Sequence, residues 1–454
     1  MTDLELAFNA LSEKRNKYDF LWAFYLGQQP LVYSRDRLRE IFKDFNANFT
    51  ENWCSVVIDS AMERIQLRQF TVADDEDTQT VLKDIAEENE LMLESDPVHL
   101  SCLVTGEAFV IAWKEADEEY PQAYYNDSRL CHAFYEAKNP RKMRFAVKCW
   151  HDDNDGYVRI NLYYADKIEY YQTGKPVKSI ADVTSHKHLI PSDLDVALNP
   201  YGAIPVFHFR KERVGIRSEL SNIVTAQNGI NKLVNDMMIA AEFGAFPQRW
   251  AITDNNLDNL KNAPNEIWKL LPAAQGDQST QLGEFSTAKL DGYLAAIDKF
   301  ATFIAISTRT PKHYFFGQGG DPSGEALIAM ESPLNKKCQK YIDRFSSTWK
   351  QLARFMLKIQ DVDINASAVA AVFDKPETVQ PYTEALIRKT NVEAGVPLVS
   401  TLRDDGWQDS EIDKMLEDRG LEQKAAQDAS GFNNPNEMSA TIQAAHRVLQ
   451  SGGN

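Results

Sequence analysis

The sequence predicts an α+β fold, and three observations support this class. Apolar residues recur at three- and four-residue spacing over the first ~90 residues, which indicates helices. From about residue 100 to 210 this spacing gives way to short aromatic and β-branched runs, which indicate strands. From residue 218 onward the helical spacing returns in three long stretches. A chain of 454 residues is long enough for two or three domains with a sizeable core.

The N-terminal half divides into a helical start and a region of strands. Helices are expected at 4–26, 52–67 and 78–93. The expected strands are "LVTGEAFVIAW", "MRFAVKCW", "YVRINLYY", "KIEYYQT" and "IPVFHFR". Asn154, Asp155 and Gly156 separate two of these runs and predict the turn of a β-hairpin.

The first long helix is expected over residues 218 to 244. Ser218 is a candidate N-cap, and Glu219 suits the positive end of the helix dipole. Pro247 ends the helical pattern. Residues 245 to 285 then carry two strand-like pieces and many turn residues, so they form a small excursion between long helices.

Two further long helices follow this excursion. One ends near residue 308, and the next runs from Glu325 to about residue 360, roughly 54 Å at ~1.5 Å per residue. Ser323 or Asp321 is its expected N-cap. Pro333 lacks a backbone N–H and clashes with the preceding turn, so this helix must kink. Shorter helices separated by Gly and Pro are expected after it, followed by a polar tail.

Charge and cysteine content narrow the possible functions. A formal net charge of -17 argues against broad gripping of nucleic acid, because such surfaces need clustered Lys and Arg. An acidic protein can still surround DNA that has to slide. The five cysteines include no C-x-x-C pair, so we expect reduced core thiols. No membrane-spanning run or signal-peptide pattern occurs, and we expect a soluble chain made in the cytoplasm with no membrane partner.

The glycine-rich stretch "GQGGDPSGEA" does not fit a nucleotide site. A P-loop needs a Lys and a preceding strand, and a dinucleotide fingerprint also needs the strand, whereas a helix precedes this stretch. The run "HDDNDGYV" fails as a calcium loop, because alignment on Gly156 places Leu162 where the closing Glu belongs.

Other catalytic and metal patterns are equally weak. His186 and His188 offer two metal ligands without an acidic or Cys partner at a recognisable spacing, and a solvated loop is the better interpretation. The acidic runs "ADDEDTQT" and "KEADEEY" are typical of solvated faces rather than of a two-metal nuclease. No G-x-S-x-G elbow is present. We therefore predict no catalytic residue, no metal and no cofactor.

The long helices themselves indicate an assembly. Each carries a wide apolar stripe, and the short excursion at 245–285 cannot cover both of the helices that flank it. Packing against neighbouring copies in a closed ring would cover these stripes. In such a ring the loop at residues 311–323 would point at the axis.

The order and spacing of the segments resemble the portal proteins of tailed bacteriophages, in the branch found in phages of actinobacteria and related hosts. The similarity runs from "YLGQQPL" to "DSEIDKM". Its anchor segments are "NWCSVVIDSAMERIQLRQF", "LVTGEAFVIAW", "IPVFHFR" leading into "GIRSELSNIVTAQNGINKLVNDMMIAAEFGAFPQRW", "TRTPKHYFFGQGGDPSGEALIAMESPL", "KKCQKYIDRFSSTWKQLARFMLKI" and "EAGVPLVSTLRDDGW".

This resemblance implies a portal fold with named parts. The expected parts are a wing (1–216), a first stem helix (217–244), a clip (245–285), a second stem helix (286–310), a tunnel loop (311–324), a long kinked helix returning to the wing (325–375), and a crown with a polar tail (376–454).

The resemblance also implies a function without catalysis. Portal proteins form a dodecameric ring at a unique capsid vertex and conduct double-stranded DNA, without sequence preference, during packaging and ejection. The expected partners are the terminase large subunit, a head-completion adaptor, and the major capsid and scaffolding proteins. The chain would be made in the host bacterial cytoplasm and reside in the virion. The alternatives are another virion assembly component, such as a minor head or scaffolding protein, or a nuclease with scattered metal ligands.

Three sets of residues are the candidates for this function. Lys312 and His313, with Gln318, are candidates for touching the DNA backbone without reading bases. The alternative is that Lys312 pairs with a neighbouring carboxylate and His313 packs on Tyr314. In the clip, the candidate partner contacts are Arg249, Trp250 and Trp268. The expected hinge residues are Pro311, Gly317, Gly319, Gly320, Gly324 and Pro333.

Overall fold

The computed structural model confirms a mixture of helices and sheets and divides the chain into two compact units, Met1–Glu377 and Thr378–Asn454. The described residues are 2–30, 51–73, 75–194, 196–245, 249–252, 281–284, 289–315, 323–362, 369–377, 381–404, 407 and 409–431.

The described N-terminal residues form helices where the apolar spacing predicts them. These are α1 (Asp3–Tyr25), α3 (Trp53–Met62) and α4 (Glu76–Glu88). A further helix, α5 (Leu91–Thr105), was not predicted, and it includes residues 103–105, which the sequence had placed at the start of a strand. The side chains of Thr2, Asn52 and Asp75 cap the first three, each accepting a backbone N–H from the first turn. The acidic run at 73–80 stabilises the start of α4. Asp75 is its N-cap, and Glu76 and Asp77 lie in its first turn, at the positive end of the helix dipole.

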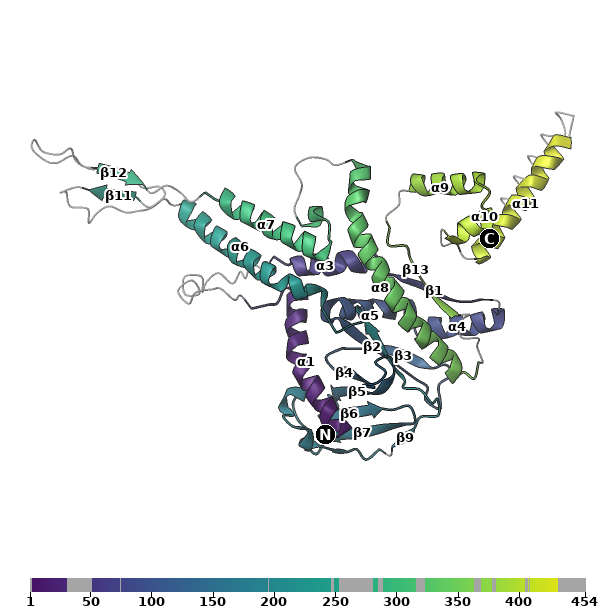
Figure 1. Cartoon of the computed structure of the whole chain (residues 1–454), viewed down its shortest axis with the longest axis horizontal. Helices are drawn as coiled ribbons and strands as arrows, with labels where there is room; N and C mark the ends of the chain where they lie inside the picture. Colours follow the sequence, from purple (N-terminus) through teal and green to yellow (C-terminus); the bar gives the residue numbers. More distant parts are fainter. Residues whose placement is uncertain are drawn as a thin grey trace, which may run out of the picture. The chain divides into compact units, whose positions relative to one another are not determined.

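Two sheets make up the body of the first unit (Figure 1). In the three-stranded sheet, β2 (Glu107–Trp113) lies between β3 (Gln122–Asn126) and β10 (Val206–Arg210). The six-stranded sheet holds β4 (Cys131–Tyr135), β5 (Met143–His151), β6 (Val158–Tyr163), β7 (Lys167–Thr173), β8 (Leu189–Pro191) and β9 (Ala197–Leu198). All neighbouring strands in both sheets are antiparallel.

The five expected strands are confirmed, but four other strands of these two sheets were not predicted. The predicted runs correspond to β2, β5, β6, β7 and β10, whereas β3, β4, β8 and β9 had no prediction. The hairpin between β5 and β6 turns where it was expected, and Gly156 has a φ of +76°, a conformation that L side chains rarely adopt. His186 and His188, expected in a solvated loop, lie in a short 3-10 helix with neither side chain buried.

Strands that are buried on both faces stack the body in layers. One face of the three-stranded sheet joins the core formed with α5 and α8 (Gly324–Ile359), and its other face packs on the six-stranded sheet. Alternate residues of β5 show the next step, since Ala146 faces the three-stranded sheet while Phe145 and Val147 pack with α1. The five cysteines are buried and free, as expected.

A strand that the sequence did not predict closes the body. The segment from Leu67 to Val72 forms β1, which pairs with β13 (Val369–Phe373) from the far end of the first unit. The sequence predicts helices for this region. No local pattern indicates a strand here, because the strand partner lies about 300 residues further along the chain.

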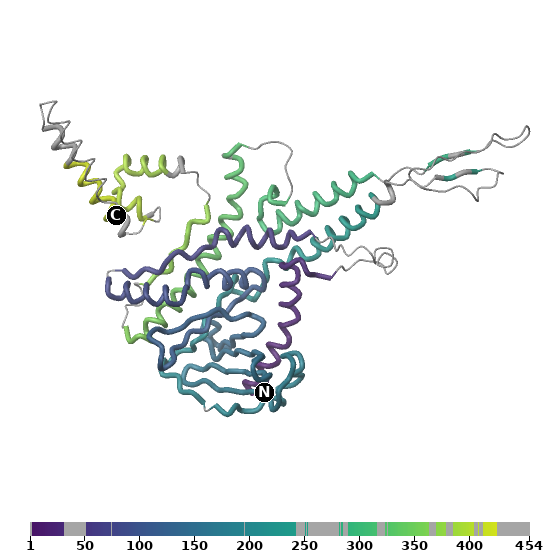
Figure 2. The backbone as a smooth tube through the Cα atoms, turned by 180° about the vertical axis from the view of Figure 1, so that it is seen from behind, coloured from purple at the N-terminus to yellow at the C-terminus, as the bar shows by residue number. Residues whose placement is uncertain are grey.

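The long helices project from this body. A 3-10 turn, η3 (Glu219–Asn222), leads into α6 (Val224–Ala245), and α7 (Asp291–Thr308) returns beside it (Figures 1 and 2). Gly229 permits the close approach of the two helices, because a Cβ at this position would lie 3.0 Å from the Phe300 ring. Between these helices, β11 (Arg249–Ile252) and β12 (Gln281–Glu284) pair antiparallel.

The helix α8 begins and bends as the sequence predicts. Ser323 is its N-cap and accepts the backbone N–H of Ala326 at 3.3 Å. Pro333 lies inside it, and the helix changes direction within its first third, the part that contains this residue (Figure 1). A turn of 3-10 helix, η4 (Lys312–Tyr314), lies between α7 and α8 in the chain.

The second unit is helical where it is described. It contains α9 (Pro381–Glu393), α10 (Leu398–Asp404) and α11 (Asp409–Gly431), around the buried side chains of Leu402 and Ile412. Across the described part of the chain, none of the helices is long and apolar enough to cross a membrane.

Trp349 of α8 is central to the main core. It is 1% exposed, lies 4.8 Å from the Phe209 ring, and donates its indole N–H to Nε2 of His99 at 2.9 Å. The other ring nitrogen of His99 lies 3.2 Å from the carbonyl oxygen of Ile65, its hydrogen-bond acceptor. Burial lowers the pKa of His99 to about 3, so the ring is neutral and accepts from the indole.

Trp349→Phe should destabilise the first unit by about 2–4 kcal/mol, because it leaves a buried His99 acceptor unpaired and removes ring volume. Urea unfolding monitored by circular dichroism measures the change. The control is Trp150→Phe, since the indole N–H of this half-buried residue has no partner among the described residues. Equal losses in the two variants would contradict the role of the hydrogen bond.

Candidate functional site

The candidate site is the region where α6, α7 and α8 meet the body, and a single carboxylate lies at its centre. Glu219 accepts hydrogen bonds from Lys337 Nζ at 2.7 Å, Lys211 Nζ at 2.9 Å and the Tyr341 hydroxyl at 2.8 Å. Lys337 also donates to the backbone carbonyl of Thr308. We call these five residues the Glu219 cluster.

The five members of the Glu219 cluster come from four parts of the fold. Lys211 follows strand β10, Glu219 opens the segment leading into α6, and Thr308 ends α7. Lys337 and Tyr341 lie one turn apart on α8. The cluster therefore ties the body to both projecting helices and to the long helix.

The cluster is buried, and its charges depend on one another. The Glu219 side chain is 6% exposed, and burial alone would raise the pKa of its carboxyl group. The attraction of Lys337 and Lys211, together with their hydrogen bonds, outweighs burial and lowers this pKa to about 2. The carboxylate is thus ionised at neutral pH and holds two cations out of water.

The segment after α7 contains Lys312 and His313. The Lys312 Nζ lies 2.8 Å from a carboxylate oxygen of Asp298, one of the α7 residues, and both side chains are about one-third exposed. The His313 ring packs edge-on against Tyr314 with centroids 4.7 Å apart. These are the contacts of the alternative considered for the two residues: the Lys312 charge is paired within the chain, and the His313 ring is packed on its neighbour.

Tyr314 and Phe315 anchor the end of this segment to the body. The Tyr314 hydroxyl accepts from Arg64 at 2.8 Å and donates to Glu331 of α8 at 3.2 Å. The Phe315 ring is 8% exposed and lies 5.7 Å from the Trp53 ring of α3. The chain therefore enters residues 316–322 from a fixed position.

The structure describes some of the other candidate residues, and the rest fall outside the described residues. Pro311 is the N-cap of η4, Gly324 is the first residue of α8, and Pro333 lies within that helix. Trp250 of β11 faces Gly283 of β12, where a Cβ would lie 2.5 Å from the indole. Arg249 begins β11. The candidates that fall outside the described residues are Gln318, Gly317, Gly319, Gly320 and Trp268.

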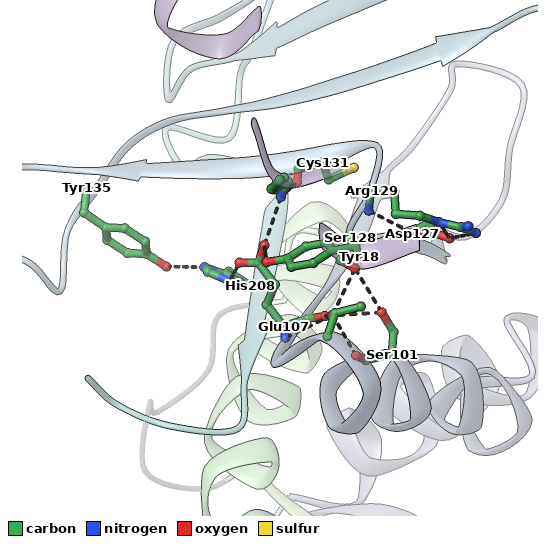
Figure 3. Close-up of polar contacts among 11 residues, drawn as sticks. Tyr18, Ser101, Glu107, Asp127, Ser128, Arg129, Cys131, Tyr135 and His208 are labelled. Atoms are coloured by element: carbon green, nitrogen blue, oxygen red, sulfur yellow. Dashed lines mark hydrogen bonds and ion pairs between the residues drawn. The ribbon is translucent and has the colours of Figure 1, made fainter. Parts of the chain in front are cut away.

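A second buried polar network lies inside the body, away from the projecting helices (Figure 3). One carboxylate oxygen of Glu107 accepts from Lys14 at 2.9 Å and from Tyr18 at 2.7 Å, and the other lies 2.8 Å from Nε2 of His208. The Tyr135 hydroxyl lies 2.9 Å from the other nitrogen of that imidazole. Glu107 is 1% exposed, so this network joins α1, β2, β4 and β10 and presents no accessible acid or base.

The ionisation of this network follows from its geometry. Burial opposes the charge on Glu107, but Lys14 and the His208 hydrogen bond lower the pKa of the carboxyl group. Burial lowers the pKa of His208 despite the nearby carboxylate. A neutral imidazole that donates from Nε2 to Glu107 and accepts at Nδ1 from Tyr135 satisfies every contact. In the part of the chain that the structure describes, no three His, Cys, Asp or Glu side chains are grouped to hold a metal ion.

The sequence missed the contacts that organise the site. Glu219 was expected only as a favourable charge at a helix start, whereas its cationic partners lie 8 residues before it and 118 residues after it. Arg309 was not singled out, although it ends α7 with a φ of +59°. No local pattern could reveal contacts between residues this far apart.

Comparisons with known proteins identify a related family. The model of the family described as "Phage portal protein, SPP1 Gp6-like" matches residues 7–380. The portal proteins of Mycobacterium phage L5 and Mycobacterium phage D29 are each 29% identical over 106 residues. The match covers 22% of this chain and 22% of each relative, so it spans about a fifth of the relatives' length.

Glu219→Gln should reduce the free energy of unfolding by about 3–5 kcal/mol at neutral pH, because two buried ammonium groups lose their countercharge. The folded carboxyl pKa of about 2 lies below its ordinary value of 4.5, so the stabilisation is complete above pH 4.5 and is lost as the pH falls towards 2. The difference between variant and wild type should shrink over this interval in urea titrations.

The matched control is Glu212→Gln, whose carboxylate is 3.7 Å from Lys211 and 34% exposed. Its loss should stay below about 1 kcal/mol. A Glu219→Gln variant as stable as this control would contradict the role assigned to the cluster.

Proposed function

Because the chain belongs to the SPP1 Gp6-like family of phage portal proteins, we propose that it forms a dodecameric ring at a unique vertex of the capsid. The ring conducts double-stranded DNA during packaging and ejection. It also serves as the docking platform for the terminase large subunit and later for a head-completion adaptor. The major capsid and scaffolding proteins surround it. The family is structural and is not a known family of enzymes.

One observation of this chain carries the proposal of a ring. The α6 and α7 pair projects from the body, and α7 leaves large apolar side chains in solvent: Leu294 is 45% exposed, Phe303 60% and Ile306 72%. Large apolar side chains exposed on a projecting helix call for a partner surface. Identical helices of neighbouring copies provide one in a closed ring.

The charge distribution supports a conduit for DNA rather than a clamp. A chain with a net charge of -17, repeated around a ring, repels phosphate on average, so DNA slides without a tight grip. Lys312 is one-third exposed and already paired with Asp298. A phosphate that replaces this carboxylate gains little net energy, and the contact stays weak enough for movement. We assign the phosphate contact to Lys312 and His313, with Gln318.

The segment between α6 and α7 is proposed as the clip, where the motor and then the adaptor dock. Trp250 is half-buried against Gly283, so one part of the indole is held and the rest is available to a partner. Aromatic and arginine side chains are enriched at such interfaces. Arg249 and Trp268 complete the proposed contact. The wing comprises residues 1–216 and the crown residues 376–454.

Electron microscopy of the purified chain tests the proposed ring. We expect discrete annular particles with a central hole and twelve-fold symmetry in class averages. Only monomers, or aggregates without a defined outline at high concentration, would refute the ring. Nuclease or ATPase turnover that persists through purification would refute the assignment of a non-catalytic role.

Lys312→Ala combined with His313→Ala should leave ring assembly intact and lower the DNA packaged or retained in the capsid several-fold, because the phosphate contact is lost. The measurement is the DNA content of capsids from phage carrying the variant. The control is Lys187→Ala with His188→Ala, which removes the same two side chains from another 3-10 helix. Wild-type packaging by the Lys312/His313 variant would place the contact elsewhere.

A further inference from the structure

A strongly basic cleft lies beside the Glu219 cluster. It has a volume of about 450 Å³ and is formed by the loop after β10, the end of α7 and the middle of α8. Two carboxylates and seven cations line it, a formal balance of +5 in a chain of -17. The cations are Lys211, Arg213, Arg217, Arg309, Lys337, Lys340 and Arg344.

The internal carboxylates do not neutralise this charge. Glu219 is fully engaged by Lys211 and Lys337. Arg213, Arg309 and Lys340 are exposed and have no hydrogen bond or ion pair with any residue that the structure describes. These three cations point to a ligand that the single chain does not supply.

The backbone at Arg309 strengthens this interpretation. Its φ of +59° places it in the left-handed region at the end of α7, a position where glycine or asparagine is usual. An arginine there costs on the order of 1 kcal/mol of backbone strain. Local structure does not favour this residue type, so we attribute its presence to its guanidinium.

The cleft continues into exposed apolar surface. Ser307 lines the cleft, and Phe303 lies one turn before it on the same face of α7. Ile306 is adjacent and 72% exposed, and Val214, which also lines the cleft, is 88% exposed. Cations flanked by bare apolar side chains are typical of a protein interface, whereas nucleic-acid surfaces are predominantly polar and cationic.

We propose that the basic cleft and these apolar residues form one side of the contact between neighbouring copies of this chain, and that the cleft receives carboxylates of the next copy. The proposal rests on the ring proposed above. Outside the cleft the chain carries a formal charge of -22, so a second copy is rich in carboxylates. A ring of acidic copies also needs local attraction to offset their mutual repulsion.

DNA is the less favoured occupant. Five cations beyond those held by Glu219, gathered at one place, would release counterions and hold phosphate firmly, which opposes sliding. A contact between subunits is static and gains from the same charges. Such a contact joins two different surfaces of the same chain, as ring closure requires.

Charge reversal tests the proposal. The variant is Arg309→Glu with Lys340→Glu in the full-length chain, and the matched control is Arg141→Glu with Lys175→Glu. The control residues are also exposed and lack side-chain partners among the described residues. Sedimentation velocity over a range of concentrations and between about 0.1 and 0.5 M NaCl gives the distribution of assembled and free chains.

We expect the wild type and the control variant to assemble at the same protein concentration. Both assemblies should weaken as the NaCl concentration rises. The cleft variant should need about tenfold more protein, or more, for half-assembly. Thermal unfolding checks that the variant is folded, and Arg309→Ala with Lys340→Ala replaces it if reversal prevents folding. Cross-linking of amines to carboxyls in assemblies of ¹⁴N- and ¹⁵N-labelled chains should join Lys340 to an acidic residue of the other isotope.

Three results would overturn the proposal. If wild type forms rings and the cleft variant forms them equally well, the cleft is not part of the contact, although the proposed function stands. If assembly is unchanged but retention of DNA on a filter falls, phosphate is the occupant. If wild type forms no ring at any salt concentration, the proposed function and this inference fail together.

Discussion

The architecture of the first unit depends on the burial of one charge. Glu219 is ionised out of water, and this is tolerable only while Lys211, Lys337 and Tyr341 surround it. Since these groups come from the body, α8 and the start of the α6 segment, none of these elements can shift alone without exposing an unpaired charge. The interaction therefore fixes where the projecting helices leave the body, which is the geometry that a ring of identical copies must repeat.

In the chain between α7 and α8, packing and capping contacts hold the described ends, and the cation is paired. Tyr314 and Phe315 hold one end against Arg64 and Trp53, and the cap of Ser323 starts the helix at the other. Lys312 is balanced by Asp298 rather than presented as an isolated cation. For the DNA contact proposed above, this pairing would keep the attraction to phosphate weak enough for release.

Periodicity predicted most of the elements, because a helix or a long strand that is buried on one side has apolar residues at a regular spacing. The long helices and five of the strands were visible in this way, whereas turn residues indicated the hairpin at Gly156 and proline chemistry indicated the kink at Pro333. Contacts between residues far apart in the chain produce no local spacing of this kind. The strand β1 was assigned to a helical region because its partner β13 lies about 300 residues away, and the partners of Glu219 and the cations of the basic cleft are equally scattered. For Lys312 and His313 the alternative weighed from the sequence, a carboxylate beside the lysine and Tyr314 beside the histidine, matches the contacts in the structure.

The pairing of β1 with β13 has a consequence for synthesis in the host cell. The ribosome releases the N-terminal segment first, yet β1 has no strand partner until residues 369–373 emerge. Trp349, which fills the core beside His99, is also a late arrival. The projecting helices are therefore complete before the body that carries them can close. We expect newly made chains to pass through a stage with exposed apolar helices and an open core, when premature association is most harmful.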